Sequence, residues 1–263
     1  MMANDQMIAD SDSASLTIGK IGVSDLKDAL IKGYDDFTVM PSHAVFLCVI
    51  YPIVGLMALR IVTGDSLLPL LFPLTAGYAL MGPFAAVGLY ELSRRRELGL
   101  DPSPSHIFEV LRSPGIGSIA ALGVLLTVIF IFWLVAAQEI YRATFGAEIP
   151  ASALEFLRQI FTTRAGWTLI VVGYAVGFLF AVTAFSVGVV SFPLVLDRHV
   201  GAATAIVTSL RAVAANPVTM ALWALFIAVA LAAASLPLFI GLIVVMPVLG
   251  HASWHLYRKV VAH

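Results

Sequence analysis

The sequence predicts an all-α integral membrane protein with six transmembrane helices, arranged as three hairpins with cytoplasmic amphipathic elbow helices. Hydrophobic residues make up 60 % of the 263 residues and charged residues only 12 %. A soluble domain is typically about 45–50 % apolar and about 25 % charged. Apolar stretches of the length that crosses a bilayer, about 20 residues, recur along the chain. Amphipathic stretches precede every second apolar stretch. The composition and the long apolar stretches together indicate that most of the chain is surrounded by lipid.

The first 20 residues differ from the rest and are predicted to be a disordered tail, followed by a single six-span membrane domain over residues 21–263. The tail is polar and acidic, and it has no basic segment followed by an apolar one, so it is not a signal peptide. From Ser24 onward, Leu26, Leu30 and Phe37 recur at helical spacing among charged residues. We expect an amphipathic helix on the membrane surface, with Ser24 as its N-cap.

Six apolar stretches after this helix are long enough to be spans. The last two are nearly continuous, and Ser235 and Pro237 mark a tight turn between them. The predicted spans are residues 44–62, 67–90, 116–138, 166–192, 218–234 and 236–257.

The distribution of basic residues predicts that both termini are cytoplasmic. With six spans, eleven of the fifteen lysines and arginines fall on the side of the termini. The other four, on the opposite side, are Arg60, Arg142, Arg158 and Arg164.

Each odd-numbered span is preceded by an amphipathic stretch and then a proline. The stretches are residues 25–37, 103–112 and 200–215, and the prolines are Pro41, Pro114 and Pro217. Proline fits the first turn of a helix, where its missing N–H costs no hydrogen bond. The pattern indicates either a three-fold repeat of elbow and hairpin or a coincidence among residues that are common at membrane interfaces.

The span interiors contain few groups for chemistry. The third to fifth spans hold no ionisable residue, which argues against a proton-driven pump but leaves a channel or a carrier for an apolar solute open. Gly173, Gly177 and Ala181 form a stripe of small residues in the fourth span, which predicts close helix packing. Between the third and fourth spans, Leu154 opens an apolar face at helical spacing that indicates an interfacial helix.

His251 and His255 form the most distinctive cluster, because their spacing places both imidazoles on one helix face. With His43, which is expected at the same membrane level, they are weak candidates for a haem or metal site. The alternative, which we favour, is that the histidines, Trp254 and Tyr257 are headgroup anchors at a helix end. Neither a metal site nor a cofactor is predicted, because no carboxylate is close to the pair in sequence.

Five further cations are predicted to contact lipid headgroups at the same membrane face. They are Arg94, Arg95, Arg96, Arg258 and Lys259. No hydrolase or nucleotide-binding motif is present, so we expect no catalytic residues and no enzyme activity. The single cysteine, Cys48, excludes an intramolecular disulfide framework and a cysteine zinc site. The net charge of −1 gives no reason to expect a nucleic-acid partner.

Four segments carry a family resemblance, and they are GPFAAVGLYELSRRRELGLDPS, FPLVLDRHVG, LRAVAANP and GHASWHLYRK. The chain resembles a family of bacterial integral membrane proteins of unknown function, some members of which are labelled as cytochrome c oxidase subunit I. The resemblance implies a bacterial inner-membrane location. It does not imply oxidase activity, because that subunit is a larger bundle whose metal-ligating histidines lie deep in the membrane.

These observations favour a non-catalytic accessory, assembly or organising protein of the inner membrane. Its expected partners are the lipid bilayer and other membrane proteins. One alternative is a transporter or channel for a small neutral or apolar solute. The other is a haem- or metal-binding accessory of a respiratory oxidase.

Overall fold

The computed structural model describes residues 16–40, 68–70, 73–74, 82–146, 152–237 and 239–262. Within these ranges the regular structure is helical, and a lone antiparallel bridge joins Ile18 to Val261. The all-α prediction is therefore confirmed for the described part of the chain. The first predicted span, with His43 and Cys48, lies outside the described residues.

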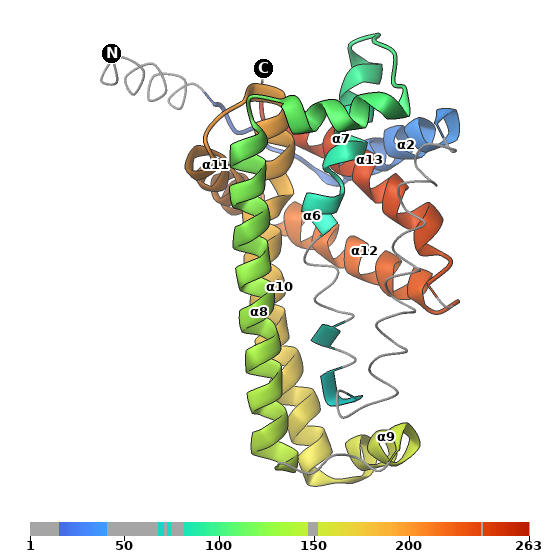
Figure 1. Cartoon of the computed structure of the whole chain (residues 1–263), viewed down its shortest axis with the longest axis vertical. Coiled ribbons are helices and arrows are strands. Elements are labelled where there is room, and N and C mark those ends of the chain that lie inside the picture. Colours follow the sequence, from blue (N-terminus) through green and yellow to red (C-terminus); the bar gives the residue numbers. More distant parts are fainter. Residues whose placement is uncertain are drawn as a thin grey trace.

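A long helical hairpin runs along the long axis of the molecule (Figure 1). It is made of α8 (Ile116–Phe145) and α10 (Arg164–Arg198), with α9 (Ala153–Thr162) at its far end. At about 1.5 Å per residue, helices of 30 and 35 residues are longer than the bilayer core of about 30 Å. Among the described residues, α8, α10 and α12 (Pro217–Ser235) are long and apolar enough to cross a membrane.

The fourth predicted span ended before Pro193, but α10 continues through this proline to Arg198. Neighbouring helices can compensate for a proline inside a membrane helix, which explains the difference. In the second predicted span, the structure describes the three-residue 3₁₀ turn η1 (Leu68–Leu70), α6 (Gly82–Ala85) and α7 (Val87–Glu97).

A second hairpin follows α11 (Ala202–Ala215), and it consists of α12 and α13 (Leu242–Val260). Pro217 occupies the first turn of α12, as predicted. The sixth predicted span began at residue 236, whereas residues 239–241 form a turn with Phe239 at φ +65°. Its helix begins only at Leu242, and the polar second half of α13 keeps it from being one of the candidate spans.

The amphipathic helix that the sequence predicted around residues 24–37 is α2 (Val23–Val39). Its N-cap is Gly22, so the prediction of Ser24 as the cap is wrong. The reason is local, because the Asp25 carboxylate accepts the backbone N–H of Gly22 at 2.9 Å. The second amphipathic stretch is also helical, but as the 3₁₀ helix η2 (Pro104–Arg112).

The buried face of α2 packs against the second half of α13. This face consists of Leu26, Ala29, Gly33 and Asp36. A Cβ atom on Gly33 would lie 2.5 Å from the backbone nitrogen of Ala252. The two helices therefore approach more closely than any side chain at position 33 would allow.

The beginning and the end of the described chain lie side by side. The backbone N–H of Gly19 donates to the carbonyl of Val260 at 2.7 Å, and that of Ala262 donates to Thr17 at 3.0 Å. The predicted disordered tail over residues 1–20 is thus wrong for residues 16–20, because these backbone groups pair with the end of α13. Residues 1–15 lie outside the described residues.

The small-residue stripe on α10 does not form a continuous helix interface, contrary to the prediction. Gly177 lies under the indole of Trp133, where an added Cβ would be 2.9 Å from the ring. An added Cβ on Gly173 would meet nothing within 4 Å, and Ala181 is exposed. Gly241, in the turn before α13, is also tightly packed, because an added Cβ would lie 2.7 Å from the carbonyl oxygen of Ala234.

Candidate functional site

A buried carboxylate, Asp36, marks the junction of α2, α7 and α13. Asp36 follows Gly33 by three residues on the same face of α2, so the close approach at Gly33 also brings Asp36 between the other two helices. Only 3 % of Asp36 is exposed. A buried charge is costly unless it is paired and hydrogen-bonded, so its surroundings must supply donors.

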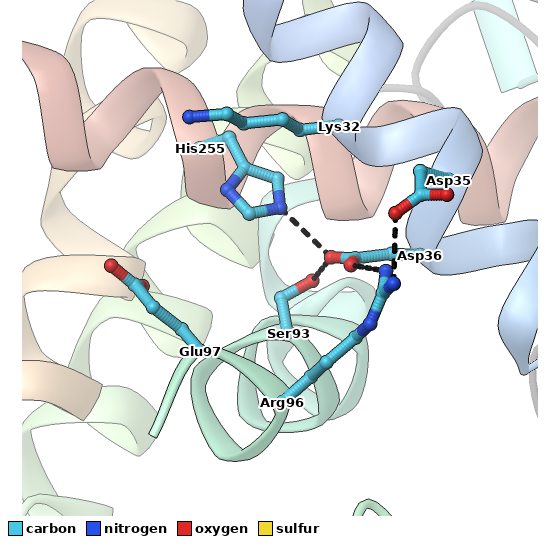
Figure 2. Close-up of a pocket in the computed structure, with 7 residues that line it drawn as sticks. All are labelled: Lys32, Asp35, Asp36, Ser93, Arg96, Glu97 and His255. Carbon is cyan, nitrogen blue, oxygen red and sulfur yellow. Dashed lines mark hydrogen bonds and ion pairs between the residues drawn. The ribbon is translucent and has the colours of Figure 1, made fainter. Parts of the chain in front are cut away.

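Three side chains donate to this carboxylate (Figure 2). The Ser93 hydroxyl from α7 donates to Oδ2 at 2.5 Å, and His255 from α13 donates through Nε2 to the same oxygen at 2.8 Å. Arg96, also from α7, donates to Oδ1. We call Asp36, Ser93, Arg96, His251 and His255 the Asp36 cluster. It joins three helices through one charge.

His251 is the innermost member of the Asp36 cluster and is fully buried. Its Nδ1 lies 2.7 Å from the Ser93 hydroxyl oxygen. Since that hydroxyl gives its proton to Asp36, it accepts a hydrogen bond from the His251 Nδ1–H. The other ring nitrogen, Nε2, makes no hydrogen bond within the described residues.

The environment of Asp36 keeps it ionised. Burial acts to raise the pKa of this carboxyl, but the hydrogen bonds from His255 and Ser93 and the nearby imidazoles outweigh it. The pKa is lowered below its usual value of 3.8. Asp36 is therefore an anion at neutral pH, and it links α2 to its neighbours by charge-assisted hydrogen bonds.

The prediction that the histidine pair and the aromatic residues beside it are headgroup anchors is wrong. His251, Trp254 and Tyr257 are all buried between helices. The Trp254 indole N–H donates to Glu97 at 3.0 Å. The prediction considered only carboxylates near the histidines in sequence, and it therefore missed those that tertiary packing brings close.

The five cations predicted to contact lipid headgroups lie at this end of the molecule, and each pairs with an acid of the same chain. The pairs include Arg94–Glu91 at 2.7 Å, Arg95–Glu109 at 2.9 Å, Arg96–Asp35 at 2.8 Å, Arg258–Glu97 at 3.0 Å and Lys259–Asp28 at 2.9 Å. Contact of these cations with lipid remains a prediction.

An open hollow of about 300 Å³ lies beside the Asp36 cluster (Figure 2). Three helices line it, with Asp36 and Ser93 as its buried polar floor. The lining residues are Lys32, Asp35, Asp36, Ser93, Arg96, Glu97 and His255. Among the described residues, no group of three or more His, Cys, Asp or Glu side chains is arranged to hold a metal ion.

Sequence reasoning found the two histidines but missed Asp36 and Ser93. One signal for Asp36 was available, because residues 26, 29, 33 and 36 recur at helical spacing and an acid on a buried face needs a partner. Ser93 carried no such signal. Its position in a run of charged residues did not indicate that it would be buried.

Comparison with known proteins places this geometry in a membrane-protein context. The model of a family described as "Predicted integral membrane protein (DUF2189)" matches residues 71–197. This chain is a membrane protein. The predicted resemblance to a membrane-protein family of unknown function is thereby confirmed. The match includes α7, α8 and α10, whereas Asp36, His251 and His255 lie outside it. Neither the curated proteins nor the solved structures contain a match.

Proposed function

We propose that this protein is a non-catalytic accessory or organising protein of the bacterial inner membrane, which holds other membrane proteins at its cytoplasmic face through α2. The observation that supports this proposal is the two-sided character of α2. Its inner face is bound to α7 and α13, while its outer face presents large apolar side chains. Val23, Ile31 and Tyr34 are each more than half exposed.

The attachment of α2 to the body of the protein holds that outer face in one orientation. The Asp36 cluster binds the end of the helix, and the Lys259 ammonium binds its beginning, 3.1 Å from Asp25 and 2.9 Å from Asp28. The backbone N–H of Gly22 and the Lys259 ammonium lower the pKa of Asp25, and the Lys259 ammonium lowers the pKa of Asp28. A helix fixed at both ends does not need to be ordered when a partner binds, which reduces the entropic cost of association.

The proposal includes six spans, arranged as three hairpins with cytoplasmic elbows and cytoplasmic termini. Two observations support it. The pairing of residues 17–19 with the end of α13 places both ends of the described chain on one side. Arg142, Arg158 and Arg164 lie at the opposite end of the α8–α10 hairpin (Figure 1), in accordance with the basic-residue asymmetry.

Purification from the native membrane in a mild detergent tests the organising role. We expect defined membrane proteins to co-purify with the wild-type chain and to be reduced several-fold by Ile31→Glu. Lys27→Glu is the matched control, because Lys27 is exposed on the same outer face of α2 and the change adds the same carboxylate without removing an apolar side chain. Melting temperatures of both variants equal to that of the wild type would show that folding is unchanged.

The same preparation can overturn the proposal. An unchanged set of co-purifying proteins in Ile31→Glu would remove the role of the outer face of α2. A wild-type protein without stoichiometric partners that carries a solute into proteoliposomes would instead establish transport.

A further inference from the structure

The hollow beside the Asp36 cluster contains polar groups that are not used to hold the helices together. His255 donates to Asp36 through Nε2, and this is the hydrogen bond that its ring makes within the described residues. Its Nδ1 therefore carries a lone pair that can accept a hydrogen bond from a ligand. Figure 2 shows this second nitrogen turned away from Asp36, on the side where the Lys32 side chain ends.

Lys32 is also available to a ligand. Its ammonium lies 3.3 Å from Asp28, in an exposed pair one helical turn apart. Pairs of this kind contribute little to stability, and Asp28 has a second partner in Lys259. Lys32 can therefore exchange Asp28 for a ligand at small cost.

The charges around the hollow are of both signs and lie on different walls. Lys32 supplies donors on one side, and the Glu97 carboxylate lies on another (Figure 2). Glu97 accepts from Trp254 and from Arg258, each at 3.0 Å, and its two oxygens have further lone pairs for a ligand donor. Asp35 and Asp36 are paired with Arg96. The hollow thus offers donors at Lys32 and acceptors at Glu97 and the His255 Nδ1, an arrangement that suits a small zwitterion.

We propose that this hollow binds a phosphoethanolamine group, with its phosphate at Lys32 and its ammonium at Glu97 and the His255 Nδ1. A membrane aminophospholipid can supply this group, because the hollow lies at the end of the molecule where α10 ends and α8 begins. A primary ammonium donates N–H bonds to a carboxylate, whereas the trimethylated ammonium of choline cannot. This site goes beyond the proposed organising role and requires no protein partner.

Lipid retention tests this site. The purified, delipidated protein is incubated with vesicles of equal parts phosphatidylethanolamine, phosphatidylcholine and phosphatidylglycerol, and the retained lipids are quantified. We expect several-fold enrichment of phosphatidylethanolamine over both others. Lys32→Gln should abolish the enrichment, whereas Lys27→Gln on the same helix should preserve it.

A third variant examines the ammonium end of the site. In Glu97→Gln the side chain can still accept from Trp254, but it carries no charge and loses its ion pair with Arg258. Phosphatidylethanolamine should therefore lose its advantage over phosphatidylcholine. Melting temperatures of all variants separate loss of the site from loss of the fold.

Competition with soluble phosphoethanolamine distinguishes the sources of the group. Displacement of the lipid at millimolar concentration would show recognition of the headgroup alone, and lack of displacement with persistent enrichment would show that the site requires lipid. Equal retention of the three lipids, a preference for phosphatidylglycerol, or equal losses in Lys32→Gln and Lys27→Gln would overturn the proposal. Since no co-purifying protein is measured, failure here leaves the organising role unaffected.

Discussion

Replacement of Gly33 by alanine should destabilise the protein, although alanine is the better helix former by about 1 kcal/mol. The added Cβ would lie 2.5 Å from the backbone nitrogen of Ala252 and 2.7 Å from its Cα and Cβ atoms. Carbon contacts are comfortable at about 3.5–4.0 Å, so α2 must move away from α13 by about 1 Å. Backbone atoms on both sides leave no flexible side chain to absorb this displacement.

The same displacement would break the Asp36 cluster. Hydrogen bonds of 2.5 Å from Ser93 and 2.8 Å from His255 would lengthen beyond hydrogen-bonding distance. Overpacking of a core costs about 1–3 kcal/mol, and a buried charge that loses part of its pairing adds a comparable amount. After subtraction of the gain in helix propensity, we expect a net loss of about 2–4 kcal/mol.

The assay is the melting temperature of the purified protein in detergent, which should fall by roughly 5–15 °C in Gly33→Ala. Gly173→Ala is the control, because Gly173 also lies within a helix but an added Cβ meets nothing within 4 Å. The control should melt at the wild-type temperature or slightly above. A Gly33→Ala protein as stable as Gly173→Ala would refute the close packing of α2 on α13.

Three further predictions concern charge, cofactors and topology. Asp36→Asn should lower the melting temperature at pH 7. Because the pKa of Asp36 is lowered, its stabilising contribution is complete above the unfolded value of 3.8 and is lost as the pH falls through the lower folded value; a wild-type advantage that does not decline as the pH falls below 3.8 would contradict this. The purified protein should carry no stoichiometric haem or transition metal, because the Nδ1 of His251 and the Nε2 of His255 are used in hydrogen bonds within the Asp36 cluster; a Soret band, or one metal per chain that disappears in His251→Ala, would show otherwise. Reporter fusions after Gly99 and Ala262 should report a cytoplasmic location and fusions near Gly146 an external one, and an external C-terminus would end the six-span proposal.

The membrane helices in the middle of the chain were predictable because their signal is local. The third predicted span began at residue 116, and α8 begins at Ile116. The fifth was predicted over residues 218–234, and α12 covers Pro217–Ser235. Composition over about 20 residues decides whether a segment can cross a bilayer, so no knowledge of its neighbours is needed. Helix ends were less accurate where a turn, as before Leu242, depends on the packing of both flanking helices.

The candidate site was predictable only in part, because its members are far apart in the chain. The i, i+4 spacing identified His251 and His255 as a pair on one face. Asp36 is 57 residues from Ser93 and 219 residues from His255. The pair was interpreted as headgroup anchors because the C-terminal half of α13 was assumed to be surrounded by lipid and water.

The sequence by itself determined that this chain is helical and resides in a membrane, because both properties follow from composition and from periodicity within single segments. It also predicted the amphipathic helix that the structure shows as α2. Only the tertiary structure decided that this helix binds α13 through Gly33 and that Asp36 becomes buried. Burial of a charge depends on donors from other helices, and no pattern within one segment contains that information.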